Sequence, residues 1–163
     1  MLLEFSSSIM CLILSGKVGS NIASELGTMR TTQQIDALEI MGVNPASFLI
    51  LPKIAGLVTL MPLLVVFSTF SGIIGAYATA YVGHIITPSD LTAGLQHSFV
   101  PWFFWMGVVK SLFFAFIISS VSSFYGYNVE GGSIEVGKAS TGAVVSCSML
   151  ILFSDLFLTH ILS

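Results

Sequence analysis

Long apolar runs separated by short polar segments are the main pattern along this sequence. Four runs are about as long as a helix must be to cross the hydrocarbon core of a membrane, which takes about 20 residues. They cover residues 5–23, 54–82, 102–124 and 139–162. Membrane-crossing strands are about ten residues long and alternate in polarity. The pattern therefore predicts four transmembrane helices.

The polar segment between the first two runs has the composition of a helix rather than of a linker. Residues 25–42 contain no proline and mostly good helix formers, and Gly42 stands where a helix would stop, ahead of Pro45 and Pro52. At 100° per residue, the polar side chains share one narrow face. That face is formed by Glu25, Thr28, Thr32, Asp36 and Glu39. We expect a single helix that either lies on the bilayer or docks onto a cytoplasmic partner. Its acidic face favours docking, because interfacial helices usually present Lys and Arg to anionic lipid.

Composition supports the membrane assignment. Apolar residues make up 55% of the chain and charged residues 8%, whereas soluble domains carry about a quarter charged residues. So few charges could not cover a water-soluble fold. The predicted fold class is all-α integral membrane, with about four transmembrane helices plus one cytoplasmic helix in a single domain over residues 1–163.

The basic residues predict the orientation of the helices. Lys17, Arg30 and Lys53 surround the first polar segment and Lys138 lies in the third, while residues 84–101 contain no Lys or Arg. By the positive-inside rule, the first and third segments are cytoplasmic and both chain ends lie outside. A net charge of −3 with scattered basic residues gives no support for nucleic-acid binding.

Two charged residues fall inside predicted spans at comparable depth. A charge there is costly unless it is paired or faces a wet cavity, so we expect an ion pair between Lys110 and Asp155. The functional alternative is that one or both line a polar path for a charged headgroup. Glu4 could be a third such group, or it could sit at the membrane interface.

The second run contains features that affect helix shape and packing. Pro62 should kink the helix. Small residues recur there at four-residue spacing, which permits close helix packing or a dimer contact. We call them the small-residue seam: Ser68, Ser71, Gly72, Gly75 and Ala76. Cys11 and Cys147 lie inside predicted spans, so we expect packing residues rather than a disulfide.

Catalytic and metal motifs find little support. Residues 132–138 match the spacing of a phosphate-binding loop, but Ala139 replaces the required Ser or Thr and Glu135 would repel phosphates. His84, His97 and His160 have no acid or Cys at ligand spacing. We expect no catalytic residue, no metal and no cofactor, so energy for any transport must come from another chain.

Two stretches resemble a known family. Residues 15–53, SGKVGSNIASELGTMRTTQQIDALEIMGVNPASFLILPK, are similar to the signature region of MlaE/YrbE-type permeases, the membrane subunits of ABC transporters that move lipids between bacterial membranes. Residues 126–141, GYNVEGGSIEVGKAST, are similar to the family's second motif, and the ILFSD run ending at Asp155 follows it. The resemblance covers nearly the whole chain.

The resemblance implies a function and a set of partners. The segment 25–42 corresponds to the coupling helix that seats in a groove of the ATPase subunit, with Glu25, Arg30, Thr32, Asp36 and Glu39 as its candidate residues. The implied assembly is a homodimer in the bacterial inner membrane, with a cytoplasmic ABC ATPase and a periplasmic MCE-domain lipid-binding protein. Its implied substrate is phospholipid, moved between the inner and outer membranes to maintain outer-membrane lipid asymmetry.

Individual positions match the family to different degrees. Lys110 matches a Lys before Ser in the family's penultimate span. Glu4 corresponds to the acid of an R-E-L-G-P stretch from which residues 1–6 otherwise depart. Family permeases have an amphipathic helix and further membrane sequence before this point, so we expect the chain to be truncated or to start at a downstream Met. Two other functions stay open: an ion- or proton-coupled carrier that uses Lys110 and Asp155, and a scaffold that transports nothing.

Overall fold

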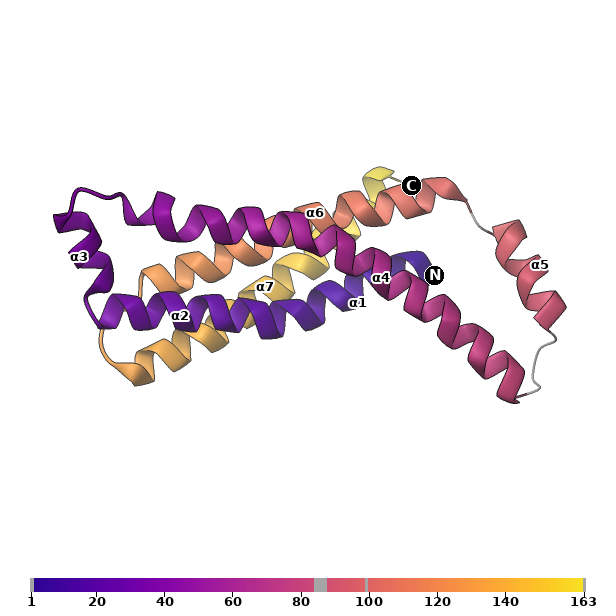
Figure 1. The fold of residues 1–163 in the computed structure, drawn as a ribbon, viewed down its shortest axis with the longest axis horizontal. Helices are drawn as coiled ribbons and strands as arrows, with labels where there is room; N and C mark the ends of the chain where they lie inside the picture. The colour runs from indigo at the N-terminus through magenta and orange to yellow at the C-terminus, as the bar shows by residue number, and fades with distance from the viewer. Residues whose placement is uncertain (1, 84–87, 99, 163) are drawn as a thin grey trace.

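The described part of the chain is built from helices, as predicted. The computed structural model describes residues 2–83, 88–98 and 100–162, and these residues contain no β-strand. The helices are α1 (Leu2–Leu14), η1 (Ser15–Gly19), α2 (Ser20–Thr31), α3 (Gln34–Ile40), η2 (Ala46–Ile50), α4 (Leu51–Gly83), α5 (Pro88–Ser98), α6 (Pro101–Tyr127) and α7 (Ser133–Leu162). Figure 1 shows them as a long bundle, with α3 at one end and α5 at the other.

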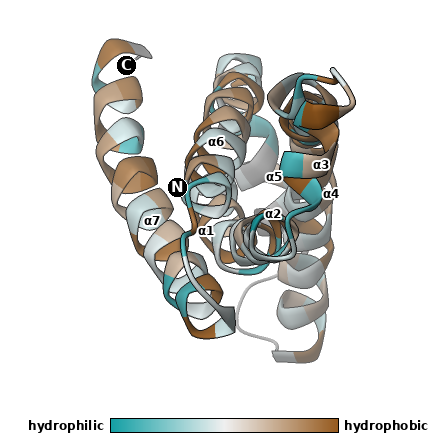
Figure 2. Ribbon diagram, turned by 90° about the vertical axis from the view of Figure 1, so that its left-hand side faces the viewer, coloured by the Kyte–Doolittle hydropathy of each residue, from teal (hydrophilic) through white to brown (hydrophobic). Residues whose placement is uncertain are grey.

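Helix α6 is the centre of the bundle. It packs against α1, α2, α4 and α7. The core contains side chains from α1, α4, α6 and α7: Cys11, Met61, Val65, Phe114, Ala115, Ile118 and Ile151. The outer helices expose large apolar side chains, such as Phe153 and Phe157 on α7, and Figure 2 shows hydrophobic residues along the length of that helix. Such a surface is suited to lipid rather than to water.

Within the described residues, three helices are long and apolar enough to cross a membrane, by length and composition. They are Ala46–Gly83, Pro101–Tyr127 and Ser133–Ile161; the first two contain the second and third predicted spans, and the last covers the fourth except for its final residue. The predicted span 5–23 lies in the continuous rod of α1, η1 and α2, which is not among these three. The chain is therefore a multi-pass membrane protein, and the rod of α1, η1 and α2 is less apolar than its other long helices.

Several serines lower the hydropathy of that first rod. Three of them form polar contacts with other helices. The hydroxyl oxygens of Ser6 and Ser68 lie 2.9 Å apart, between α1 and α4. Ser7 donates to the carbonyl of Gly107 on α6 at 3.4 Å. Ser15 lies 3.4 Å from Ser148 on α7. Polar contacts of this kind join helices where no water is present.

The expectation of a single helix over residues 25–42 is wrong. Helix α2 ends at Thr31, and Gln33 adopts the left-handed conformation with φ 59° before α3 begins. The Thr32 hydroxyl donates to the Thr28 carbonyl at 2.7 Å, a local bond that competes with helix continuation. Glu25 therefore lies on α2, in the first rod, whereas Asp36 and Glu39 lie on α3. The polar residues do not share one helix face.

The stop predicted at Gly42 is present. Its φ of 77° is a conformation that glycine adopts at little cost. Its N–H donates to the Glu39 carbonyl at 3.0 Å, and the next N–H, of Val43, donates to Leu38 at 3.0 Å. These bonds satisfy carbonyls at the end of α3 and let the chain turn back into η2 and α4.

The second half of α4 leaves the bundle. The helix continues through Pro62, and in Figure 1 it changes direction in its middle and leads away from α6 towards α5. A Cβ atom built at Gly72 or Gly75 would meet no heavy atom within 4 Å. At these two glycines the small-residue seam is therefore not packed against another helix of this chain.

Candidate functional site

A polar cluster joins three helices at the α3 end of the bundle. The guanidinium of Arg30, in the last turn of α2, donates to Asp36 Oδ1 on α3 at 2.8 Å. The same guanidinium lies 5.7 Å from the ring centroid of Tyr127, the last residue of α6, within the range of a cation–π contact. Tyr127 Oη donates to Glu39 Oε1 on α3 at 3.3 Å. We call Arg30, Asp36, Glu39 and Tyr127 the α3 cluster.

Helix α3 has one anchored side and one open side. Ile35 is fully buried and fixes the helix to the bundle. At its C-terminal end, Ile40 and Met41 are 87% and 71% exposed. Two large apolar side chains beside acidic groups form a small surface suited to contact with another protein.

The other predicted coupling residues lie near this cluster but outside α3. Glu25 on α2 forms an ion pair with Lys53 at the start of α4, which fastens α2 to α4. Thr32 lies in the turn between α2 and α3 and bonds to the backbone of α2. Of the five predicted residues, only Asp36 and Glu39 lie on α3 itself.

Close packing beneath α3 holds α2 and α6 together. A Cβ atom built at Gly126 would lie 2.7 Å from the backbone oxygen of Ala23 and 2.8 Å from Leu26 Cβ. One at Gly27 would lie 3.2 Å from side-chain atoms of both Val129 and Val136, around the turn between α6 and α7. A Cβ at Gly126 would overlap α2, and one at Gly27 would crowd the two valines, so the ends of α2 and α6 are packed closely together.

The second charged site lies inside the bundle, between α6 and α7. Lys110 Nζ lies 3.2 Å from Asp155 Oδ1 and donates to Thr159 Oγ1 at 2.7 Å. The Thr159 hydroxyl in turn donates to the Asp155 carbonyl at 2.6 Å. The structure thus brings together the two charges that the depth argument paired, and adds a hydroxyl that the sequence analysis missed.

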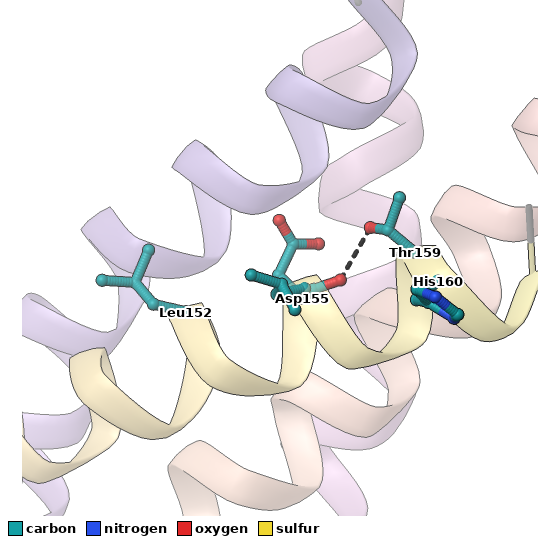
Figure 3. A pocket seen from close by; sticks show the side chains of 5 residues that line it. Leu152, Asp155, Thr159 and His160 are labelled. Atoms are coloured by element: carbon teal, nitrogen blue, oxygen red, sulfur yellow. Dashed lines mark hydrogen bonds between the residues drawn. The ribbon is translucent and has the colours of Figure 1, made fainter.

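Asp155 contacts a buried lysine and also borders an open depression. The side chain of Lys110 is 1% exposed and that of Asp155 is 28% exposed. An open depression of about 700 Å³ along α7 borders Asp155, and Figure 3 shows the side chains that line it. Its lining residues are Leu152, Asp155, Leu156, Thr159 and His160. The backbone of Glu4 lies in α1, but its side chain is outside the described residues.

The glycine-rich segment, the cysteines and the described histidines form no catalytic or metal site within the described residues. Ser133 to Lys138 form the first turns of α7, and Lys138 Nζ bonds to Glu135 at 2.8 Å instead of pointing into a phosphate cradle. Both cysteines are free and buried. Across the described ranges no three His, Cys, Asp or Glu side chains gather as metal ligands; His84 falls outside those ranges.

Comparison with known proteins decides the family. The family model described as Permease MlaE matches residues 1–161. The chain belongs to the MlaE permease family. Of the two motifs that suggested this family, residues 15–53 run from η1 through α2, α3 and η2 to the start of α4, and residues 126–141 run from the end of α6 to the first turns of α7. They therefore meet at the α3 end of the bundle.

Curated relatives of this MlaE-family chain are described as probable ABC transporter permease proteins. One from Rickettsia felis is 35% identical over 163 aligned residues, which cover 92% of this chain and 58% of the relative. One from Pyropia yezoensis is 32% identical, with 96% of this chain and 60% of the relative covered. One from Synechocystis sp. is 30% identical, with coverage of 98% and 60%. The chain thus spans about three fifths of the length of these relatives.

Proposed function

We propose that this chain is the permease subunit of an ABC transporter that moves phospholipid between the inner and outer membranes of a bacterium. Membership of the MlaE family and three helices suited to a bilayer support this role. The chain carries no catalytic function of its own, and a separate cytoplasmic ATPase subunit supplies the energy. The process served is the maintenance of outer-membrane lipid asymmetry.

The observation that carries this proposal is the position of α3. It is a short helix at the end of the bundle, fixed by Ile35 and by the α3 cluster, with Ile40 and Met41 exposed. Helices that dock into a partner's groove present apolar anchors beside polar groups. We assign α3 and its flanking turns as the surface that docks onto the ATPase.

The charges support a cytoplasmic location for this end of the bundle. Arg30, Lys53 and Lys138 lie at the end of α2, the start of α4 and the start of α7, all near α3 in Figure 1. The positive-inside rule places such an end in the cytoplasm. The opposite end, with α5, then faces the periplasm, where the MCE-domain lipid-binding protein would receive or deliver the lipid.

The part of α4 that leaves the bundle supports a homodimer. Gly72 and Gly75 of the small-residue seam have open space around them, beyond the contact of Ser68 with Ser6 on α1. Helices with small residues at four-residue spacing associate by close backbone contact. In the proposed dimer, two copies of this chain enclose a lipid-sized cavity that opens and closes as the ATPase acts on α3.

The intramembrane charges are proposed to line the lipid path. Lys110 and Asp155 are paired beside an open depression along α7, and Glu4 lies on neighbouring α1. A zwitterionic headgroup offers both a phosphate and an amine to such a pair. The double variant Lys110→Met with Asp155→Asn tests this role. It should assemble but move no phospholipid, whereas full transport by an assembled double variant would limit the pair to a structural role.

Binding of the ATPase subunit tests the docking proposal. We expect the variants Asp36→Lys, Glu39→Lys and Ile40→Ser each to weaken retention of the ATPase by about tenfold or more, as loss of a central interface contact does. Ile40→Ser leaves both polar contacts of α3 in place. Glu130→Lys is the matched control, because Glu130 is exposed in the turn between α6 and α7. The proposal is wrong if the wild-type chain retains no ATPase or if all three variants retain it fully.

A second candidate function is a carrier driven by ions or protons, with Lys110 and Asp155 as its relay. The buried ion pair at an open depression favours it, because ionisable residues within membranes often form such relays. Such a carrier would need no ATPase and would respond to the proton gradient. The docking surface on α3 would then have no role in transport.

A further inference from the structure

The connection between α3 and the membrane-spanning part of the chain is narrow. Among the described elements, the backbone of α3 packs closely only against α2. Beside the buried side chain of Ile35, polar contacts at Tyr127 link α3 to α6: the bond from Tyr127 Oη to Glu39, and the ring beneath Arg30, which itself bonds to Asp36. A force on α3 reaches α6 through these contacts and through the end of α2.

Helix α6 leads from this joint to the intramembrane charges. Tyr127 and Lys110 lie on the same continuous helix, about 25 Å apart at 1.5 Å per residue. The close packing of Gly126 against Ala23 makes the ends of α2 and α6 move together. A displacement of Tyr127 is therefore carried along a stiff rod to Lys110 and its partner Asp155.

The polar contacts between α3 and the ends of α2 and α6 are weak enough to allow α3 to move. The side chains of Arg30 and Asp36 are 34% and 49% exposed, and ion pairs exposed to this degree add little to folding stability. The bond from Tyr127 to Glu39 is also exposed. Their removal should leave the bundle folded while it changes how α3 and α6 move relative to each other.

We propose that Arg30 and Tyr127 are positioning residues that form a latch, which transmits movement of α3 to α6 and thereby couples ATP hydrolysis to lipid movement. This inference rests on the proposed function and adds to it. Neither residue needs to touch the ATPase or the lipid. Arg30 holds α3 to the end of α2 through Asp36. At the end of α6, the Tyr127 ring lies beneath Arg30 and its hydroxyl donates to Glu39.

The matched variants are Tyr127→Phe and Tyr125→Phe. Each removes one tyrosine hydroxyl, and with it one hydrogen bond, from the same helix. Tyr127 bonds to Glu39 on α3, whereas Tyr125 Oη lies 2.8 Å from Ser146 Oγ on α7. The phenylalanine at position 127 keeps the ring beneath Arg30, so the variant isolates the hydroxyl contact.

The measurement is the number of lipids moved per ATP hydrolysed. The complex of this protein with its ATPase subunit is reconstituted in liposomes that contain a headgroup-labelled phosphatidylethanolamine, and transfer and hydrolysis are followed together. We expect Tyr127→Phe to lower the ratio by about two- to tenfold, the range of one hydrogen bond, with the ATPase still bound. Tyr125→Phe should leave the ratio unchanged. A double-mutant cycle of Tyr127→Phe with Glu39→Ala, which removes the acceptor, should give a combined loss no larger than that of the more affected single variant.

Different results overturn different claims. If the wild-type complex holds no ATPase or moves no lipid, the proposed function fails. If the wild type works and Tyr127→Phe keeps the wild-type ratio, the latch is wrong while the proposed function stands. Equal losses for Tyr127→Phe and Tyr125→Phe would also overturn the latch, because they would show a general loss of rigidity in α6. Additive losses in the double-mutant cycle would overturn the proposed contact.

Discussion

Neutralising one member of the ion pair between α6 and α7 should destabilise the protein, and by unequal amounts for the two members. Asp155→Asn removes the carboxylate charge that lies 3.2 Å from the ammonium of Lys110, which is 1% exposed. Removing one partner of a buried ion pair costs about 3–5 kcal/mol. Lys110→Met leaves Asp155, which is 28% exposed and borders the open depression. Partial access to solvent lowers that cost to about 1–2 kcal/mol.

Two further variants show whether the cost comes from loss of the attraction between the two charges. The double variant Lys110→Met with Asp155→Asn leaves neither charge, so its free energy of unfolding should return to within about 1 kcal/mol of the wild type. Thr159→Val removes only the hydroxyl that accepts from Lys110, and should cost about 1 kcal/mol.

Unfolding in mixed micelles with increasing dodecyl sulfate measures these free energies, with the fluorescence of Trp102 and Trp105 on α6 as the signal. The expected order of destabilisation is Asp155→Asn, then Lys110→Met, then the double variant. If Asp155→Asn costs no more than Thr159→Val, or the double variant costs the sum of its two singles, the two charges do not stabilise each other.

Three further predictions follow from the packing. Gly126→Ala should cost about 1–3 kcal/mol in the same titration, because its Cβ would overlap the backbone of α2; Gly56→Ala on α4, which meets open space and lies outside the small-residue seam, should stay within about 0.5 kcal/mol of the wild type. Gly42→Ala should cost about 1 kcal/mol, since φ is 77° there, and a φ-tolerant Gly42→Asn should cost less. Cys11 and Cys147 are both fully buried, so a membrane-permeant maleimide should label them only after unfolding; rapid labelling of the native protein would contradict this packing.

Hydropathy and charge were sufficient to predict most of the membrane architecture. Long apolar runs can only be helices in lipid, so the spans around α4, α6 and α7 follow from composition alone. The pairing of Lys110 with Asp155 follows from depth, because two lone charges at the same level of adjacent helices have few other partners. Thr159 stands four residues after Asp155, on the same side of α7, and that spacing could have identified it.

The sequence pattern could not predict the break between α2 and α3 or the contacts of α3 with α6. Good helix formers over residues 25–42 gave no sign of a break, because the break depends on one residue, Gln33, in a left-handed conformation and on a threonine hydroxyl that bonds to the backbone. The contact between Tyr127 and Glu39 joins positions 88 residues apart. Local periodicity contains no information about such a pair, which forms only when α2 and α6 pack at Gly126.

The most direct test of the proposed function is the energy source of lipid movement. Liposomes that contain this protein with its ATPase subunit and a headgroup-labelled phosphatidylethanolamine are given ATP, with and without a protonophore. We predict transfer of the lipid that requires both ATP and the ATPase subunit and that continues when the proton gradient is collapsed. Transfer that proceeds without the ATPase subunit and stops with the protonophore would contradict the proposed function and favour the ion-coupled carrier.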